Sequence, residues 1–401
     1  MIVQGLLLVD AHQPPLPGWL AIEDQRIVEM GQGQPPRTAT DVVGGVSPDR
    51  TLICPGFIDA HLHLPQIDSI GCDGMELLDW LDRVIYPAEM RWADEAAIAG
   101  QVASAYQRLL RSGTLGYAAF LTSHFHGYVH VVRTGYGLPL RAIVGQSLMD
   151  RNAPPELLNQ PLTRIAASER ARVTSSVNPR YAVSCSDALL EIARQRAAGN
   201  TIIHTHLAEN QRECELVRQL FPNDPNYTSV YDRHGLLTDR TLLAHCLHLN
   251  DDEWRLIAQR RSVVVHCPSA NTFLKSGVFD LNAIRAHDVR LALGSDIAAG
   301  PDLAMPRVAR AMIEVAKMRS MTIDRNAHIP TPAEAWNLIT RGNADALGWT
   351  DAGRLEMGAA ADLLVLQLPF DVDEHLIGRL IYTWRDDYIA LRIVAGRSVR
   401  N

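Results

Sequence analysis

Short apolar segments alternate with helical segments through the middle of this 401-residue chain. Each segment has the length and composition of a strand and is followed by enough residues for a crossover connection. The eight segments are residues 56–64, 113–120, 141–148, 172–177, 201–207, 241–249, 262–266 and 289–294. Eight β/α units predict an α/β fold, a closed (β/α)8 or TIM barrel. A doubly wound open sheet is the alternative, but no Gly-x-Gly-x-x-Gly motif follows any segment.

The two ends of the chain share a different pattern, short strand candidates separated by Pro and Gly residues. The candidates are residues 5–9, 19–22, 26–30, 41–43, 362–366, 388–394 and 397–399. Each end alone has too few strands for a stable sheet, so we expect both ends to combine in one small, β-sandwich-like domain. The predicted domains are 1–53 plus 355–401 for this small β domain, and 54–354 for the barrel.

The overall composition is that of an ordinary globular protein. Hydrophobic residues make up 47% of the chain, charged residues 21%, and the formal net charge is −7. This net negative charge argues against nucleic acid or an anionic membrane as a partner. No apolar run reaches the roughly 20 residues that span a bilayer, and no basic signal-peptide region is present. The six cysteines include no Cys-x-x-Cys pair, so we expect reduced thiols and a cytoplasmic location.

The first predicted barrel strand ends in a His-x-His pair, His61 and His63. Alternate residues of a strand point to the same face, so these two imidazoles can bind one divalent cation. Such a cation generates hydroxide from water near neutral pH. Active sites of such barrels lie at the carboxyl ends of the strands, so further ligands are expected at those ends.

Polar residues suited to a metal site also occur at the ends of three other predicted strands. They are His206 at the end of strand five, Glu209 just after it, His245 on strand six, and Asp296 after strand eight. Nitrogen and oxygen ligands of this kind suit zinc or iron. Each residue alone has a simpler explanation: a helix cap for Asp296, a first-turn acid for Glu209, or a core hydrogen bond for His245. Their shared position at one rim of the barrel instead predicts a site.

Three further histidines are not expected to bind the metal. His124 and His126 form a second His-x-His beyond strand two, in a segment that we expect to be a loop. Their expected role is solvent exposure or contact with a substrate. His204 shares a strand face with His206, and we expect it to make a buried polar contact or to support a ligand.

The sequence resembles the amidohydrolase superfamily in residues 55–63, which contain the His-x-His pair, and in residues 358–365. The resemblance covers nearly the whole chain and implies a hydrolase barrel with a composite β domain. Binuclear members carry a lysine at the end of strand four, where residues 175–180 of this chain contain none. A mononuclear, deaminase-type site is therefore implied, with one Zn²⁺ per chain and Fe²⁺ as the alternative.

Within the superfamily, the chain is similar to the branch that deaminates guanine, a small-molecule purine. The stretches that carry this similarity are residues 63–66, 78–81, 86–89, 178–181, 206–210 and 266–271. The metal ligands implied by the resemblance are His61, His63, His206 and Asp296. A homodimer is also implied by the resemblance.

The same resemblance implies roles for the residues around the metal. Glu209 is expected to be the proton shuttle, and His245 and Asp296 to position the attacking water. Hydroxide would add at C2 of guanine, giving xanthine and ammonia. An arginine fork pairs well with the O6 and N7 acceptors of guanine, and a glutamine amide can donate and accept. The implied purine-binding residues are Gln66, Arg180 and Tyr181.

Departures from the pattern of this branch leave other substrates open. Tyr181 stands where the branch has phenylalanine, and residues 298–301 replace a more glycine-rich turn. The alternative is the same mononuclear site acting on another aminated heterocycle: an oxidised purine, a pterin or a triazine. A third hypothesis is a catalytically silent barrel kept for binding or assembly, but such a protein should lose its metal ligands, and this sequence retains them.

Overall fold

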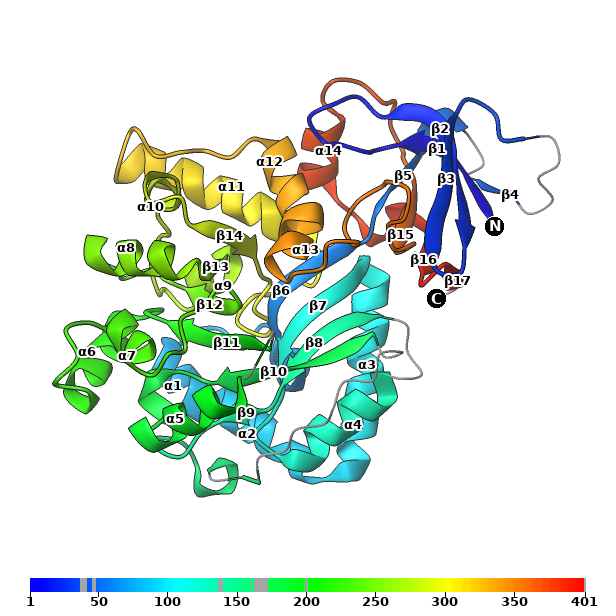
Figure 1. Cartoon of the computed structure of the whole chain (residues 1–401). Coiled ribbons are helices and arrows are strands. Elements are labelled where there is room, and N and C mark those ends of the chain that lie inside the picture. The colour runs from blue at the N-terminus through cyan, green and yellow to red at the C-terminus, as the bar shows by residue number, and fades with distance from the viewer. Residues whose placement is uncertain are drawn as a thin grey trace.

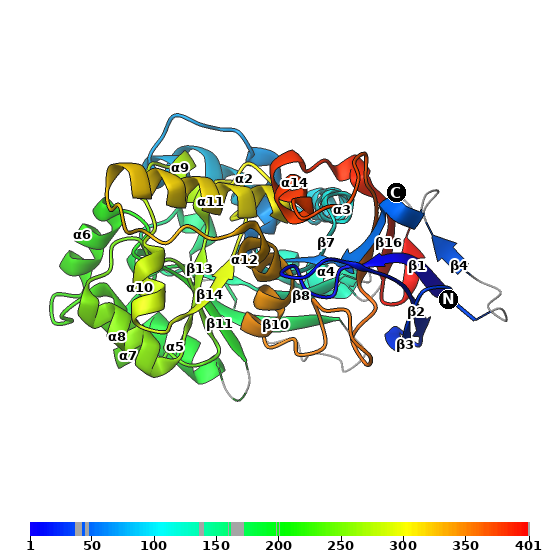
Figure 2. The same ribbon diagram turned by 90° about the horizontal axis from the view of Figure 1, so that it is seen from above.

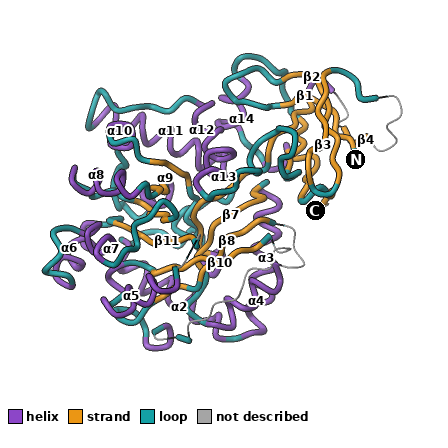
Figure 3. The backbone as a smooth tube through the Cα atoms, in the orientation of Figure 1, coloured by secondary structure: helices purple, strands orange, loops and turns teal. Residues whose placement is uncertain are grey.

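The computed structural model describes residues 1–36, 42–44, 48–135, 140–158, 160–161, 172–197, 199 and 201–399. A barrel surrounded by helices forms the larger part, and a smaller sheet built from both chain ends lies at one side of it (Figures 1 and 2). Figure 3 shows the barrel strands at the centre and the helices around them. Within the described ranges, no helix has both the length and the apolar character that crossing a membrane requires.

The larger sheet is a nearly closed barrel with eight parallel strands in the described ranges, which confirms the (β/α)8 prediction over the open sheet. The strands pair in chain order: β6 (Phe57–His63), β7 (Thr114–Phe120), β8 (Arg141–Gly145), β10 (Val173–Pro179), β11 (Ile202–Leu207), β12 (Thr241–His245), β13 (Val263–His266) and β14 (Arg290–Leu293). The short strand β9 (Ser147–Leu148) pairs with β10. All of these strands are largely buried, as expected for a parallel sheet covered by helices.

Polar side chains close the seam between the first and last barrel strands. Asn343 donates through Nδ2 to the carbonyl oxygens of Ile58 (2.6 Å) and Leu293 (2.8 Å), and its Oδ1 accepts from the Leu293 N–H (2.8 Å). Asp59 Oδ1 accepts from the N–H of Ser295 at 2.9 Å. Buried backbone groups need such partners, so these bonds replace a regular strand ladder and hold β6 beside β14.

Gly294 permits the close approach of the two strands at this seam. A Cβ atom at this position would lie 2.7 Å from His61 Cβ and 3.0 Å from the His61 carbonyl oxygen. Two residues later, the Asp296 N–H donates to that same carbonyl oxygen at 2.8 Å. The missing side chain of Gly294 thus brings the Asp296 backbone against the strand that carries the His-x-His pair.

Helices cover the outside of the barrel, and their buried faces form one hydrophobic core with its strands. The longer helices are α3 (Glu95–Ser112), α4 (Phe125–Gly135), α5 (Asp187–Arg196), α6 (Gln211–Leu220), α8 (Asp251–Arg260), α11 (Met305–Thr322) and α14 (Leu376–Thr383). The shorter ones are α1 (Leu77–Trp80), α2 (Tyr86–Met90), α7 (Tyr227–Arg233), α9 (Pro268–Phe273), α10 (Leu281–Ala286), α12 (Pro332–Asn337) and α13 (Asn343–Ala346).

The sequence around α3 explains where this helix begins, which face it buries and where it ends. The Asp94 carboxylate accepts from the N–H of Ala96 at 2.9 Å and caps the first turn. Ile98, Val102 and Leu109 recur at helical spacing and are buried. Gly113 adopts a φ of 82°, the left-handed conformation that ends a helix and that glycine adopts without strain.

The strands from the two chain ends form one continuous sheet, which confirms that both ends build a single β unit (Figure 1). Strand β5 joins the ends, because it pairs with N-terminal β1 on one side and C-terminal β15 on the other. In sheet order the strands are β17 (Arg397–Val399), β16 (Ile389–Val394), β15 (Leu363–Gln367), β5 (Thr51–Pro55), β1 (Ile2–Leu7), β2 (Leu16–Glu23) and β3 (Arg26–Gln32), with β4 (Val42–Gly44) beside β1. The strand predicted at 41–43 corresponds to β4, except that residue 41 lies outside the described ranges. The domain boundaries at 53/54 and 354/355 stay predictions.

Three details of the sequence interpretation were wrong. The predicted strand 141–148 is interrupted at Gln146, whose Nε2 donates to the Ser123 carbonyl at 2.5 Å. The predicted strand 241–249 ends at His245, because His245 and Cys246 have φ values of 74° and 56° that break the extended conformation. His126 lies within helix α4 and not in a loop.

Candidate active site

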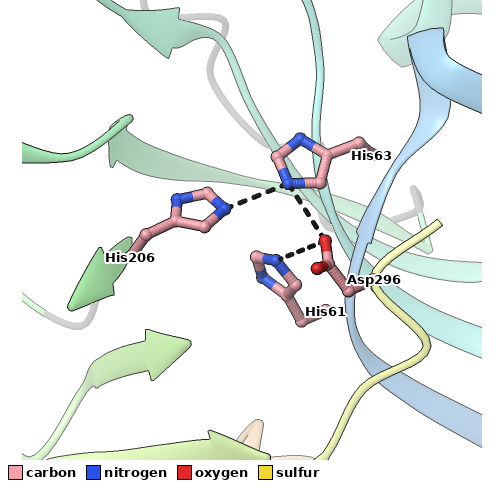
Figure 4. Close-up of side chains that lie close together, drawn as sticks. All are labelled: His61, His63, His206 and Asp296. Atoms are coloured by element: carbon pink, nitrogen blue, oxygen red, sulfur yellow. Dashed lines mark hydrogen bonds and ion pairs between the residues drawn. The ribbon is translucent and has the colours of Figure 1, made fainter. Parts of the chain in front are cut away.

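Four predicted metal ligands converge at the carboxyl end of the barrel. His61 and His63 lie on β6, His206 lies on β11, and Asp296 follows β14. Figure 4 shows their side chains pointing toward one centre. All four residues are buried, and their potential ligand atoms lie within 4.8 Å of one another. We call these four residues the metal centre.

The spacing within the metal centre fits one small ion. Asp296 Oδ1 lies 3.2 Å from His61 Nε2 and 3.4 Å from His63 Nε2, and the Nε2 atoms of His63 and His206 are 3.0 Å apart. Tetrahedral zinc with bonds of about 2.0–2.1 Å separates its ligand atoms by about 3.4 Å. His61 Nε2 is buried and has no hydrogen-bond partner among the described residues. A bound metal would satisfy this atom.

Hydrogen bonds behind two of the imidazoles orient their Nε2 atoms toward the centre. His206 Nδ1 donates to the Arg180 carbonyl oxygen at 2.6 Å, and His61 Nδ1 lies 2.6 Å from His204 Nε2. Because a carbonyl only accepts, the proton of His206 sits on Nδ1 and its Nε2 lone pair is free. Burial lowers the pKa of His61, His63 and His206 well below the usual value. The rings are therefore neutral, which is the form that binds metals.

His245, predicted to be catalytic, lies beside the metal centre. Its Nε2 is 3.4 Å from Glu209 Oε2 and 3.7 Å from Asp296 Oδ2. Its Nδ1 donates to Asn271 Oδ1 at 2.8 Å, which leaves the Nε2 lone pair facing the site. Burial raises the pKa of Asp296 to about 6, while the nearby His245 and Arg180 lower it.

Glu209, the predicted proton shuttle, is held just before helix α6. Asn210 is the N-cap of this helix, and Glu213 Oε2 accepts from the N–H of Glu209 at 2.8 Å. Glu209 therefore precedes the helix. The simpler explanation, a first-turn acid that only stabilises the helix terminus, does not apply to it. Ser276 Oγ donates to Glu209 Oε1 at 3.3 Å. Burial, followed by the charges of Asp296 and Glu213, raises the pKa of Glu209 well above its usual value, which suits a carboxyl that takes up and releases protons.

The predicted substrate-binding residues line the same pocket as three residues of the metal centre. Gln66 follows β6 in a short turn of helix, and Arg180 and Tyr181 follow β10. These three residues share one pocket with Glu209, His63, His206 and Asp296. The apolar wall of the pocket consists of Leu77, Trp80, Leu81 and Leu274. Apolar walls with a few convergent polar groups are typical of sites for planar small molecules.

Glu89 on α2 is a polar residue of this region to which the sequence analysis assigned no role. Both of its carboxylate oxygens accept from Arg180 Nη1 at 2.8 Å, and Oε1 also accepts from Gln66 Nε2 at 2.8 Å. The Arg180 guanidinium additionally lies 5.5 Å from the centre of the Tyr86 ring. Glu89 and Arg180 are 91 positions apart, so spacing gives no signal. The resemblance of residues 86–89 to the deaminase branch was the available hint.

The three histidines that were not predicted as ligands lie outside the group of four. His124 Nδ1 is 2.8 Å from Thr122 Oγ1, and His126 is exposed and pairs with Glu95 at 3.0 Å. His204 is buried against His61, consistent with support of a ligand. In the described ranges, a second possible metal grouping combines His61 and Asp296 with His245 and Cys267. Burial raises the pKa of Cys267 well above its usual value, which disfavours the thiolate that binds metals.

Comparison with known proteins places the chain in a family. The model of the amidohydrolase family matches residues 52–399. The chain belongs to the amidohydrolase family. Guanine deaminase from Escherichia coli K12 is 31% identical over 370 residues, which cover 87% of this chain and 83% of that protein.

Solved structures show the same amidohydrolase architecture. The structure of E. coli guanine deaminase aligns with a TM-score of 0.89 and 27% identity, covering 100% of this chain and 99% of that one. Guanine deaminase from C. acetobutylicum, solved with guanine in its active site, aligns with a TM-score of 0.90 and 24% identity over 100% and 99% of the two chains. The superfamily resemblance inferred from the His-x-His region is confirmed.

Proposed function

We propose that this amidohydrolase is a guanine deaminase, which converts guanine and water to xanthine and ammonia. The observation that carries the proposal is one pocket in which His63, His206 and Asp296 of the metal centre lie together with Glu209, Gln66 and Arg180. The pocket thus holds groups for activating water, transferring protons and binding a polar ring. The similarity of the chain to E. coli guanine deaminase supports this choice of substrate.

We propose zinc, one ion per chain, as the metal, with Fe²⁺ as the alternative. Three imidazole nitrogens and one carboxylate oxygen form a donor set that suits zinc. The unpartnered His61 Nε2 and the ligand spacing fit such an ion. When bound, the metal lowers the pKa of a water molecule to about 7 and so supplies a nucleophile at neutral pH.

Glu209 is placed to move the protons of the reaction. It takes a proton from the attacking water, passes it to the ring nitrogen beside C2, and delivers a proton to the departing amine. A new C2–O bond forms, the bond from C2 to the exocyclic amino nitrogen breaks, and the remaining proton of the added hydroxyl goes to that nitrogen, giving xanthine and ammonia. Such general acid–base catalysis contributes about 10²- to 10⁴-fold. His245, whose Nδ1 is held by Asn271, orients the attacking water through Nε2, and the neighbouring Asp296 assists.

Gln66, Arg180 and Tyr181 are the proposed purine-binding residues. Arg180 points its remaining N–H groups at the oxygen and nitrogen acceptors of the purine edge, as arginine does with guanine in nucleic acids. Tyr181 packs on the ring at the apolar side of the pocket. Because these side chains are already buried without a ligand, purine binding costs little of their conformational entropy.

The central test uses Glu209→Gln with the purified, zinc-loaded protein. The variant should keep stoichiometric metal by elemental analysis, while ammonia release from guanine should fall by about 10²- to 10⁴-fold. A chelator should abolish wild-type activity, and zinc should restore it. Full activity of Glu209→Gln would remove Glu209 from the mechanism, and a wild-type protein that releases no ammonia from guanine would contradict the proposed function.

The substrate alternatives are separated by a panel of heterocycles ranked by kcat/KM. Guanine should exceed oxidised purines, pterins and triazines, and a higher rank for one of these would replace guanine as the substrate. We also propose a homodimer in the cytoplasm, with no nucleic acid or membrane partner. Light scattering on the eluting protein and cell fractionation test the oligomeric state and the location.

A further inference from the structure

The Glu89 carboxylate is the point where the two polar purine-binding candidates meet. It is 1% exposed and accepts three hydrogen bonds, two from Arg180 Nη1 and one from Gln66 Nε2. One oxygen, Oε1, is shared by both partners, so Gln66 and Arg180 lie side by side. Any ring that contacts both residues must therefore present adjacent atoms to them.

Glu89 decides which end of the Gln66 amide faces the pocket. An ionised carboxylate only accepts hydrogen bonds, so the amide nitrogen of Gln66 must point toward Glu89. The opposite end, Oε1, has the Ala298 N–H at 3.5 Å, a long contact that leaves accepting capacity. Gln66 thus offers an acceptor to a ligand, although a glutamine in isolation could offer either group.

Glu89 also balances the positive charge of Arg180 and holds its guanidinium in one orientation. Among the described residues, the side-chain hydrogen bonds of Arg180 run through Nη1 to Glu89, so the other N–H groups are available to a ligand. The Glu89 carboxylate compensates the buried positive charge, which a neutral ligand could not do. Arg180 therefore offers donors without requiring an anionic substrate.

We propose that Glu89 is a positioning residue that makes the pocket selective for a lactam edge, an N–H donor beside a carbonyl acceptor. This inference rests on the proposed deamination of guanine, whose N1–H and O6 form such an edge. Gln66 Oε1 accepts from N1–H, and Arg180 donates to O6. The edge of 2,6-diaminopurine has the reverse pattern, an acceptor at N1 beside an amino donor, with the same amine at C2. It is rejected because its N1 acceptor faces the Gln66 Oε1 acceptor and its 6-amino donor faces the Arg180 donors.

The experiment compares guanine with 2,6-diaminopurine in wild-type protein and in Glu89→Gln. The substitution keeps the shape of the side chain but allows Gln66 to turn around, and it leaves Arg180 without a compensating charge. Sites that hydrogen-bond a substrate group reject the mismatched analogue by up to about 10⁴- to 10⁵-fold. In Glu89→Gln we expect kcat/KM for guanine to fall at least about 100-fold, mainly through KM, and the guanine preference to shrink at least about 10-fold.

Two comparison variants separate positioning from general loss of structure. Glu253 is another buried carboxylate, which accepts from Thr228 and Asn250 away from the pocket. Glu253→Gln should lower the melting temperature without changing the substrate preference. Glu89→Asp keeps the charge and should retain more of the guanine preference than Glu89→Gln does. Zinc content should remain that of the wild type in all three.

The outcomes distinguish this inference from the proposed function. Wild-type protein that releases no ammonia from guanine overturns both. Wild-type activity on guanine, combined with an unchanged guanine preference in folded Glu89→Gln, overturns the role of Glu89 alone. If Glu89→Gln does not fold, Gln66→Leu removes the acceptor that Glu89 orients, and an unchanged preference in that variant overturns the inference equally.

Discussion

Replacing Gly294 by alanine should weaken metal binding, although Gly294 is not itself a metal ligand. The added methyl carbon would lie 2.7 Å from His61 Cβ and 3.0 and 3.1 Å from the His61 carbonyl oxygen and nitrogen. Carbon atoms in contact are about 3.5–4.0 Å apart, so the seam must open by about 1 Å. Asp59 and Asp296 hold the His61 backbone through hydrogen bonds of 3.1 and 2.8 Å, which limits local relief.

The consequence should appear in both stability and metal affinity. Overpacking of this kind costs about 1–3 kcal/mol of unfolding free energy. Metal–ligand distances vary by only about 0.2 Å between good sites, and the seam would move by several times that amount. Zinc affinity should therefore fall about 10- to 100-fold, as it does when a group that hydrogen-bonds a metal ligand is removed. Thermal unfolding measures the first effect, and competition with a chromogenic chelator measures the second.

Gly100→Ala is the matched control for Gly294→Ala. Gly100 lies in helix α3, and a methyl group there meets no atom within 4 Å. The substitution should leave zinc affinity unchanged and stabilise the protein by about 0.5–1 kcal/mol, because alanine is the better helix former. A Gly294→Ala variant with zinc affinity within threefold of the wild type would refute the claim that close packing at the seam sets the ligand geometry.

Two further predictions concern residues that support the metal centre. His204→Leu removes the partner of His61 Nδ1 and should lower zinc affinity about 10- to 100-fold in the same chelator competition, while the melting temperature of the zinc-free protein changes little; unchanged affinity would mean that His204 only fills space. Asn343→Leu leaves the buried Ile58 and Leu293 backbone groups without partners, at about 1–3 kcal/mol for each unsatisfied group. Denaturant unfolding should show the loss, and a decrease below about 1 kcal/mol would contradict the role of Asn343 in closing the barrel.

The barrel and the metal centre could be predicted because both depend on local patterns. An apolar strand followed by polar residues is visible in sequence, and a parallel barrel brings the carboxyl ends of its strands to one rim. The strand ends thus predicted a shared site that includes His61, His63, His206 and Asp296, and the family resemblance implied that these four bind the metal. The same logic identified His204 as a neighbour of the site, because it alternates with His206.

What the sequence could not provide depends on contacts between distant segments. Glu89 reaches Arg180 across 91 positions, and neither residue type nor spacing indicates that contact. The strand ends at Gln146 and His245 depend on backbone turns formed with neighbouring elements, which residue preferences near those positions do not reveal. His126 was assigned to a loop because Gly127 follows it, but the helix α4 includes both, since tertiary packing overrides local preference.

The position of β5 affects how the chain completes its fold during synthesis. This strand leads through Gly56 directly into β6, and one of its edges pairs with Leu363–Gln367. On a ribosome, that edge stays unmatched until Leu363–Gln367 has been made, about 300 residues after β5 itself. The strand that carries His61 and His63 is thus held in place by a segment that is made much later. A nascent chain stalled before that segment would expose an unpaired strand edge, which is prone to misassembly.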